Sequence, residues 1–127
     1  MKPENQVTSL EVSQELDKRG VKLGSYFFHA EFQDREYPEI ERRVVNSDEY
    51  VTLYMLEAPT ATELMAVLPR WTSFMRHNRR EFMCFDSTEP DVPKFVADSA
   101  ADSFAKMLLW LIDNGHLTVE QVNGAAE

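Results

Sequence analysis

The residues of this chain that are best suited to metal binding or nucleophilic catalysis are three histidines and one cysteine. His29, His77 and His116 fall in different predicted elements, and no pair has the i, i+4 spacing at which two histidines on one helix ligate zinc. Cys84 has no second cysteine to pair with, and it lies between two apolar residues of a predicted strand, which is typical of a buried structural thiol. The sequence therefore predicts no metal site, no cofactor and no thiol chemistry.

Carboxylates are abundant, but their spacing does not indicate a catalytic or calcium-binding group. The glutamates between positions 36 and 41 interleave with arginines, which is typical of a solvated strand or loop. Asp86, Glu89 and Asp91 partly resemble a calcium loop, but the glycine and the closing glutamate of such a loop are missing. No Ser-His-Asp arrangement stands out, and the four glycines are too scattered to form a phosphate-binding loop. We therefore expect that the protein is not an enzyme.

The only concentration of basic residues lies between positions 70 and 80, where arginines stand beside aromatic residues. Arginine and aromatic side chains contribute heavily to binding hot spots, and they also stack on nucleic-acid bases. The alternative, which the net charge of -9 favours, is a solvated turn whose arginines pair with the surrounding acidic surface. The candidate partner-binding residues of this segment are Arg70, Trp71, Phe74, Arg76, Arg79 and Arg80.

The overall charge limits the kinds of partner that the chain can bind. Thirteen basic and 22 acidic residues give 127 residues a formal net charge of -9, which opposes direct binding to nucleic acid or to an anionic membrane. The N-terminus lacks the apolar core of a secretion signal, and the longest apolar run, Met107–Ile112, is too short to span a bilayer. Because one cysteine cannot form an intramolecular disulfide, we expect a cytoplasmic protein.

The clearest predicted helix covers positions 97–117. Its apolar residues recur at helical spacing, and Asn114 followed by Gly115 is a C-cap signal. The polar side of this helix ends at Leu109 and Trp110. These two residues are a second candidate partner-binding patch, although we favour their burial within the domain, because a neighbouring helix needs a surface to pack on.

Two further helices are predicted from the spacing of capping boxes. Thr8 with Glu11 indicates a helix that ends at Gly20, and Thr60 with Glu63 indicates a short helix that Pro69 terminates. A final helical turn is predicted between positions 118 and 122.

Strand patterns occupy much of the remaining sequence. Alternating or β-rich composition predicts strands near 26–32, 39–45 and 50–57, and the last of these, apolar on both faces, is predicted to lie centrally. The stretches WTSFM and EFMCF flank a polar segment, which indicates a hairpin.

These elements predict a single α+β domain over residues 1–127, with residues 1–6 and 123–127 flexible. We expect one antiparallel sheet of about four to five strands covered by two to three helices. The predicted core residues are Leu10, Leu16, Phe28, Phe32, Leu53, Met55, Leu64, Leu68, Phe82, Phe104, Leu108, Leu111 and Ile112.

Three segments of the chain resemble a group of small uncharacterised acidic proteins that phages and prophages encode. The segments are LEVSQELDKRGVKLGSYFF, APTATELMAVLP and ADSFAKMLLWLIDNGHL, and together they make up 48 of the 127 residues. The resemblance implies a phage or prophage origin, with the cytoplasm of a host cell as the location, and it implies no activity and no catalytic residues. The arginine-rich segment between positions 70 and 80 lies outside the shared pattern.

The expected function is therefore that of a non-catalytic protein-binding module of phage or prophage origin, whose partner is a protein of unknown identity. One alternative is an acidic inhibitor whose carboxylates imitate nucleic-acid phosphates, although here they are dispersed and mixed with arginine. Another is a structural protein that self-associates through Leu109 and Trp110. An enzyme is the least supported reading, and the oligomeric state stays open.

Overall fold

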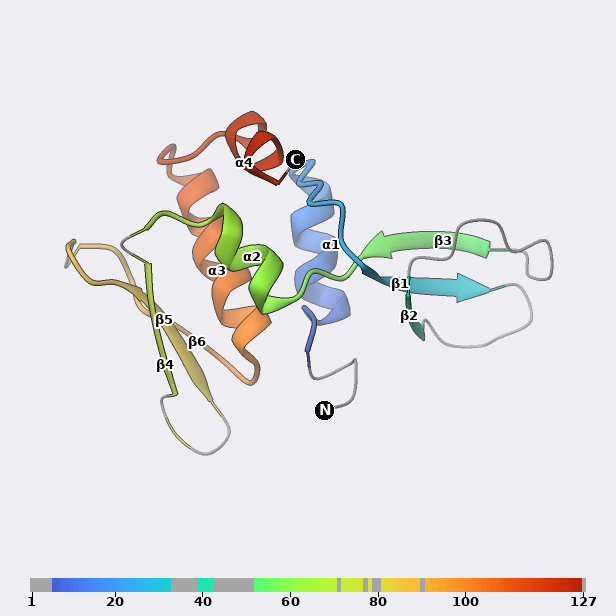
Figure 1. Cartoon of the computed structure of the whole chain (residues 1–127), viewed down its shortest axis with the longest axis horizontal. Coiled ribbons are helices and arrows are strands. Elements are labelled where there is room, and N and C mark those ends of the chain that lie inside the picture. Colours follow the sequence, from blue (N-terminus) through green and yellow to red (C-terminus); the bar gives the residue numbers. More distant parts are fainter. Residues whose placement is uncertain are drawn as a thin grey trace.

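Helices occupy the middle of the molecule, and a small β-sheet lies at each end (Figure 1). The computed structural model describes residues 6–32, 39–42, 52–70, 72–76, 78, 81–89 and 91–126, with the backbone alone described at 30–32, 39–42 and 52–55. No helix among these residues has the length and apolar character needed to cross a bilayer. The α+β class predicted from the sequence is confirmed.

Four helices form in the described part of the chain, and a hydroxyl side chain caps the start of each one. They are α1 (Leu10–Lys18), α2 (Ala61–Val67), α3 (Ala100–Asp113) and α4 (Val119–Ala125). Each capping hydroxyl accepts a hydrogen bond from a backbone N–H of the first turn, which satisfies one of the donors that a helix leaves unpaired. Helix α4 extends three residues beyond the predicted turn.

The capping residues confirm one prediction from the sequence and correct another. Thr60 and Glu63 form the predicted capping box of α2, with both reciprocal hydrogen bonds present. At α1, however, Ser9 is the cap and not Thr8. The Thr8 hydroxyl is buried and forms a hydrogen bond with the hydroxyl of Ser13, at 2.6 Å, in place of capping the helix.

Helix α3 begins later than predicted, and it ends at the predicted stop signal of Asn114 and Gly115. Ser99 caps its N-terminus, and Ala97 belongs to a strand. At its end Asn114 is the C-cap and Gly115 has a φ of 76°, a left-handed conformation that glycine adopts without steric cost.

The strands form two separate sheets, so the prediction of a single sheet with four to five strands is wrong. The first sheet has the order β2-β1-β3, and the second has the order β4-β5-β6, with every pairing antiparallel. The strands are β1 (Phe27–Phe32), β2 (Glu39–Arg42), β3 (Thr52–Glu57), β4 (Thr72–Arg76), β5 (Phe82–Asp86) and β6 (Phe95–Ala97). Helix α2 separates β3 from β4 along the chain, and the helices lie between the two sheets (Figure 1).

The position of β3 also differs from the prediction. Strand β1 lies in the centre of the first sheet and β3 at its edge. Leu56 of β3 is buried and lines a small cavity beside α1. Strand β3 therefore contacts α1 as well as β1, which accounts for its apolar composition.

The main core lies among the four helices and one face of the second sheet. Six of the predicted core residues are buried: Leu16, Leu64, Leu68, Phe104, Leu108 and Leu111. Four others are only partly buried: Leu10, Phe28, Phe82 and Ile112. The side chains of Phe32, Leu53 and Met55 lie outside the described residues. Buried residues that the sequence analysis missed include Val21, Leu23, Met107 and Val122.

Two carboxylates hold the loop that leads into β1. Glu57, at the end of β3, accepts backbone hydrogen bonds from Leu23, Gly24 and Ser25, at 2.9, 3.0 and 3.3 Å. Glu63 accepts another from the N–H of Tyr26, at 3.1 Å. The loop is therefore fixed by residues that follow it by more than thirty positions in the sequence.

Candidate functional site

The hairpin of β4 and β5 contains the described part of the arginine-rich segment. In its register Phe74 lies opposite Cys84, and Met75 lies opposite Met83. Opposite residues of an antiparallel pair point to the same face of the sheet, and successive residues point to opposite faces. Phe74 therefore lies on the face that packs on α3, and Met75 lies on the other face.

Phe74 and Met75 are adjacent, large and apolar, and yet well exposed. The Phe74 ring stacks on Phe82 and on Phe104 of α3, with centroid distances of 5.7 and 5.1 Å, but the side chain stays 42% exposed. Met75 is 47% exposed. Among the described residues only Tyr26 and Met65 are exposed hydrophobic side chains of comparable size. The sequence analysis did not single out Met75, because alternation along a strand does not tell which face stays uncovered.

Exposed arginines lie just before β4 and at its end. Arg70 is exposed in the turn before the strand, where the N–H of Thr72 donates to the carbonyl of Pro69. Arg76 is exposed at the end of β4, and its Nε donates to the carbonyl of Asn78 at 3.2 Å. The other three residues of the predicted set, Trp71, Arg79 and Arg80, lie outside the described residues, as does the neighbouring His77.

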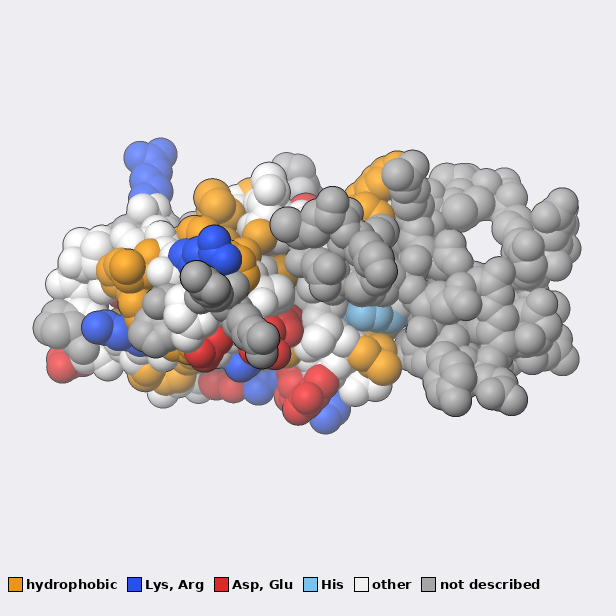
Figure 2. Space-filling view, turned by 90° about the horizontal axis from the view of Figure 1, so that it is seen from below, with side chains coloured by type: hydrophobic (Ala, Val, Ile, Leu, Met, Phe, Trp, Pro, Cys, Tyr) orange, Lys and Arg blue, Asp and Glu red, His pale blue; other side chains and the backbone are white. Residues whose placement is uncertain are grey.

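Phe74, Met75 and Arg76 are exposed side by side along the edge strand β4, with side chains on both faces of the sheet, and we call these three residues together the β4 surface. Figure 2 shows hydrophobic and basic side chains next to one another at the end of the molecule that holds β4–β6. Arginine beside exposed apolar side chains is the combination that interface centres favour over the rest of a protein surface.

The second predicted patch is largely covered by the protein itself. Leu109 and Trp110 are both partly buried against the core. The Trp110 ring stacks on His116 with a centroid distance of 5.2 Å and lies 6.3 Å from Phe95 of β6. Phe74 instead contacts Phe104, almost two helical turns earlier in α3, so the two predicted patches do not form one surface through the described contacts.

A hollow of about 590 Å³ lies beside Trp110 and contains the three carboxylates that partly resemble a calcium loop. Asp86 uses one carboxylate oxygen to accept hydrogen bonds from the N–H and hydroxyl of Thr88 and from the N–H of Glu89. Its carboxylate therefore stabilises the turn that follows β5. Within the residues that the structure describes, no group of three His, Cys, Asp or Glu side chains is arranged to hold a metal ion.

A second hollow, of about 840 Å³, lies where α2 and α3 begin. Its polar lining includes Asp98 and Asp102. Asp102 accepts the backbone N–H of Ser9 at 2.8 Å, so this carboxylate links the first turns of α1 and α3.

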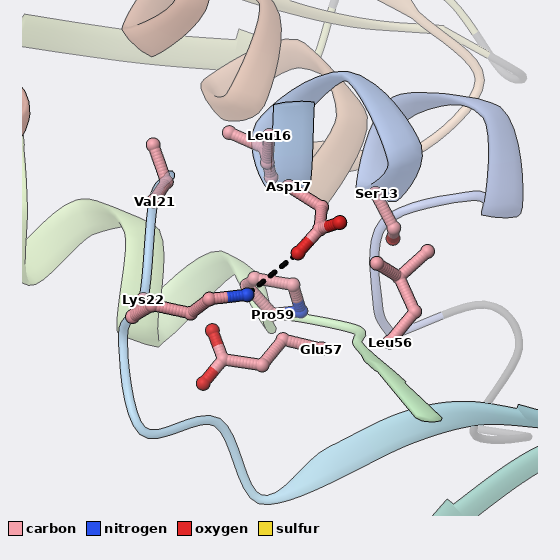
Figure 3. A pocket seen from close by; sticks show the side chains of 8 residues that line it. All are labelled: Ser13, Leu16, Asp17, Val21, Lys22, Leu56, Glu57 and Pro59. Atoms are coloured by element: carbon pink, nitrogen blue, oxygen red, sulfur yellow. Dashed lines mark hydrogen bonds and ion pairs between the residues drawn. The ribbon is translucent and has the colours of Figure 1, made fainter. Parts of the chain in front are cut away.

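A much smaller cavity lies between α1 and the end of β3 (Figure 3). Its volume of about 10 Å³ is that of a single water site. Lys22 points across it to Asp17, with 2.6 Å between Nζ and Oδ1, and Glu57 lies on the other side (Figure 3). This cavity is too small for an organic ligand.

His29 and Cys84 are buried inside the protein. The Nε2 atom of His29 lies 2.9 Å from the carbonyl oxygen of Thr8 and must donate its proton, since a carbonyl only accepts. Burial lowers the pKa of His29, and the hydrogen bond to the Thr8 carbonyl, followed by the nearby charge of Asp102, partly opposes this. Burial raises the pKa of Cys84 to about 12, which keeps it a thiol and agrees with the predicted structural role.

Comparison of the chain with protein-family models, with curated proteins and with solved structures finds no match.

Proposed function

We propose that this protein is a non-catalytic protein-binding module, a phage or prophage accessory protein that engages a host or phage protein through the β4 surface. The observation that carries this proposal is the exposure of two adjacent large apolar side chains, Phe74 and Met75, beside the exposed Arg76. Burying apolar surface contributes roughly 25 cal/mol per Å², so a partner that covers these two side chains gains binding energy directly.

The position of Phe74 suits an anchor for a partner. Its ring is held between Phe82 and Phe104, which limits its motion in the free protein. A side chain that is already ordered loses little conformational entropy when a partner packs on it. Phe74 therefore offers exposed apolar area at a low entropic cost.

The three segments that resemble phage and prophage proteins fall mostly on the helical core. They contain α1 with the loop into β1, then α2 up to Pro69, and α3 with its Gly115 end. The β4 surface lies between the second and third segments, outside the shared pattern. This division supports a common scaffold that presents a member-specific recognition hairpin.

The alternative of a nucleic-acid mimic has less support. A mimic needs an array of carboxylates that are available to a partner, but several here pair with cations of the same chain. Arg19 binds Asp113 with two hydrogen bonds of 2.7 Å and also contacts Glu15, and Lys22 pairs with Asp17. These ion pairs reduce the negative charge that the helical part of the surface presents.

The test compares two methionines of similar exposure. Met75→Gln changes the β4 surface, whereas Met65→Gln changes α2, where Met65 is 55% exposed. We expect tagged wild-type protein and the Met65 variant to capture the same partner from host lysate, and the Met75 variant to lose it by about tenfold, as a hot-spot substitution does.

Quantitative mass spectrometry of the captured proteins gives the readout. A second variant, Arg76→Ala, examines the charged part of the same surface. If both β4 variants retain every protein that the wild type captures, the proposal is wrong.

A further inference from the structure

We propose that the β4 surface binds an extended acidic segment of its partner, which adds to the outer edge of β4 as a fourth strand of the β4-β5-β6 sheet. This inference rests on the proposed protein-binding function and specifies the chemistry of the partner. It derives from one juxtaposition: an edge strand with apolar side chains on both faces lies between exposed arginines, on a protein that is otherwise strongly acidic.

The two edges of this sheet differ. At the β6 edge, Nζ of Lys106 in α3 donates a hydrogen bond to the backbone carbonyl of Val96, at 3.3 Å. One backbone acceptor of β6 is therefore already used by a side chain of the same protein. On the other edge, β4 pairs with β5, and no other described strand lies against it. Among the strands that the structure describes, β4 therefore has a partner on one edge only, and its other edge is where a further strand could add.

The side chains of β4 suit an added strand. Phe74 and Met75 point to opposite faces and are both exposed, so a strand beside β4 would contact an apolar side chain on each face. In strand addition, main-chain hydrogen bonds give affinity, and contacts with alternate side chains give specificity. A strand of five residues spans about 16 Å, which is long enough for a short linear segment.

Charge selects the kind of segment. Arg70 and Arg76 are exposed on either side of the strand interior, and the sequence continues with two more arginines at positions 79 and 80. At physiological ionic strength the Debye length is about 8 Å, so the exposed arginines next to a bound strand act on it more strongly than distant carboxylates do. The local charge therefore favours an acidic segment despite the net charge of -9.

Two described carboxylates beside the hairpin bind within its own turns, as Arg76 binds the carbonyl of Asn78. Asp86 lies opposite Thr72, and its Oδ1 accepts three hydrogen bonds within the turn after β5. Glu81 accepts a hydrogen bond from the side-chain amide of Asn78 in the hairpin loop. These carboxylates lie on the β5 side of β4, away from the edge where a strand would add.

The same charges disfavour a second copy of this chain as the occupant. If two β4 strands paired antiparallel about Phe74, Arg76 of each copy would lie opposite Thr72 of the other. Arg70 lies two positions before Thr72, so the pairing would bring arginines of the two copies close together twice. Arg76 of one copy and Arg70 of the other are then diagonal neighbours across the two strands, and like charges at that range repel each other.

The test uses three synthetic peptides in which valine alternates with glutamate, threonine or lysine. NMR chemical-shift titration of the full-length protein at about 0.15 M ionic strength measures their affinities. We expect the glutamate peptide to bind most tightly and the lysine peptide about fivefold or more weakly, because local charge decides the order. The net charge of -9 alone would produce the opposite order, so the two explanations are distinguished.

Matched charge reversals locate the effect. Arg76→Glu should remove the preference for the glutamate peptide, whereas Lys18→Glu, which makes the same charge change on the exposed surface of α1, should leave it intact. Hydrogen exchange of the β4 amides should slow when the glutamate peptide is bound, as expected if they enter a new strand pairing.

The outcomes separate this inference from the proposed function. If the lysine peptide binds best, or if no peptide shifts the β4 resonances, strand addition by an acidic segment is wrong, while partner capture that depends on Met75 would still support protein binding. If capture does not depend on Met75 or Arg76, the proposed function itself is wrong.

Discussion

Asp102, in the first turn of α3, accepts a hydrogen bond from the backbone N–H of Ser9, the residue that caps α1. The two residues are 93 positions apart in the sequence, and 2.8 Å separates the nitrogen from Oδ1. The Asp102 backbone N–H in turn donates to the hydroxyl of Ser99, the cap of α3. One residue therefore joins the starts of two helices that contact each other.

Replacing Asp102 by alanine should destabilise the protein. The change removes a charge-assisted hydrogen bond and a carboxylate near the N-termini of two helices, which together contribute about 1–2 kcal/mol. Urea denaturation gives the free energy of unfolding. Asp98→Ala is the control, because Asp98 is exposed and precedes α3, and a loss of equal size in both variants would contradict the role given to Asp102.

His29 should make stability depend on pH between neutral and mildly acidic conditions. Its pKa in the folded protein lies below the ordinary value of 6.5, because burial penalises the charged ring. The unfolded state therefore binds the proton first, so stability is fully present above pH 6.5 and declines as the pH falls below that value.

The measurement is the free energy of unfolding of the wild type and of His29→Gln at a series of pH values. Glutamine keeps a donor for the Thr8 carbonyl and does not titrate. The difference between the two proteins should shrink as the pH falls from 6.5 toward 5. A difference that does not change with pH would contradict the prediction. The charged group that acts on His29 from a packed helix is Asp102.

Cys84 should resist thiol reagents as long as the protein is folded. It is fully buried, so a reagent cannot reach the sulfur, and its pKa is raised to about 12, so little reactive thiolate forms. Absorbance-based titration with a chromogenic disulfide should show very slow reaction in buffer and rapid reaction in denaturant. Rapid reaction of the native protein would show that the face of β5 toward α3 opens easily.

Two glycines should respond to alanine in opposite ways. Gly115 has a φ of 76°, so Gly115→Ala should destabilise by about 1 kcal/mol, although a Cβ atom there would meet no other atom. Gly124 lies within α4 without a positive φ, and a Cβ there also meets open space. Gly124→Ala should therefore stabilise by about 0.5–1 kcal/mol. Thermal unfolding compares them, and equal effects would contradict the helix-end role of Gly115.

Helices were predicted well because their end signals are local in the sequence. The Thr60–Glu63 capping box and the glycine after α3 were both readable from spacing. The capping-box spacing of Thr8 and Glu11 points to Thr8 as the cap of α1, although Ser9, the next residue, is an equally suitable hydroxyl. What separates them is the buried contact of Thr8 with Ser13, a tertiary interaction that spacing does not reveal.

The division into two sheets could not be read in the same way. Strand partners are chosen by contacts between distant segments, and β6 is only three residues long, too short for a period to appear. The arginine and aromatic composition does predict the hairpin as a candidate binding site. The exposure of Phe74 and Met75 depended on β4 being an edge strand, which became known only from the sheet order.

The hydrogen bonds that Glu57 accepts from the backbone of the loop into β1 influence the order in which the chain folds. The loop at 23–25 is fastened by a carboxylate 32 to 34 positions downstream, so a long stretch of chain must return before the loop gains its partner. Closing such a loop costs chain entropy before any contact compensates for it. The capped helices can order early from local signals, whereas the loop into β1 gains its partner only after the chain has returned to place Glu57 beside it.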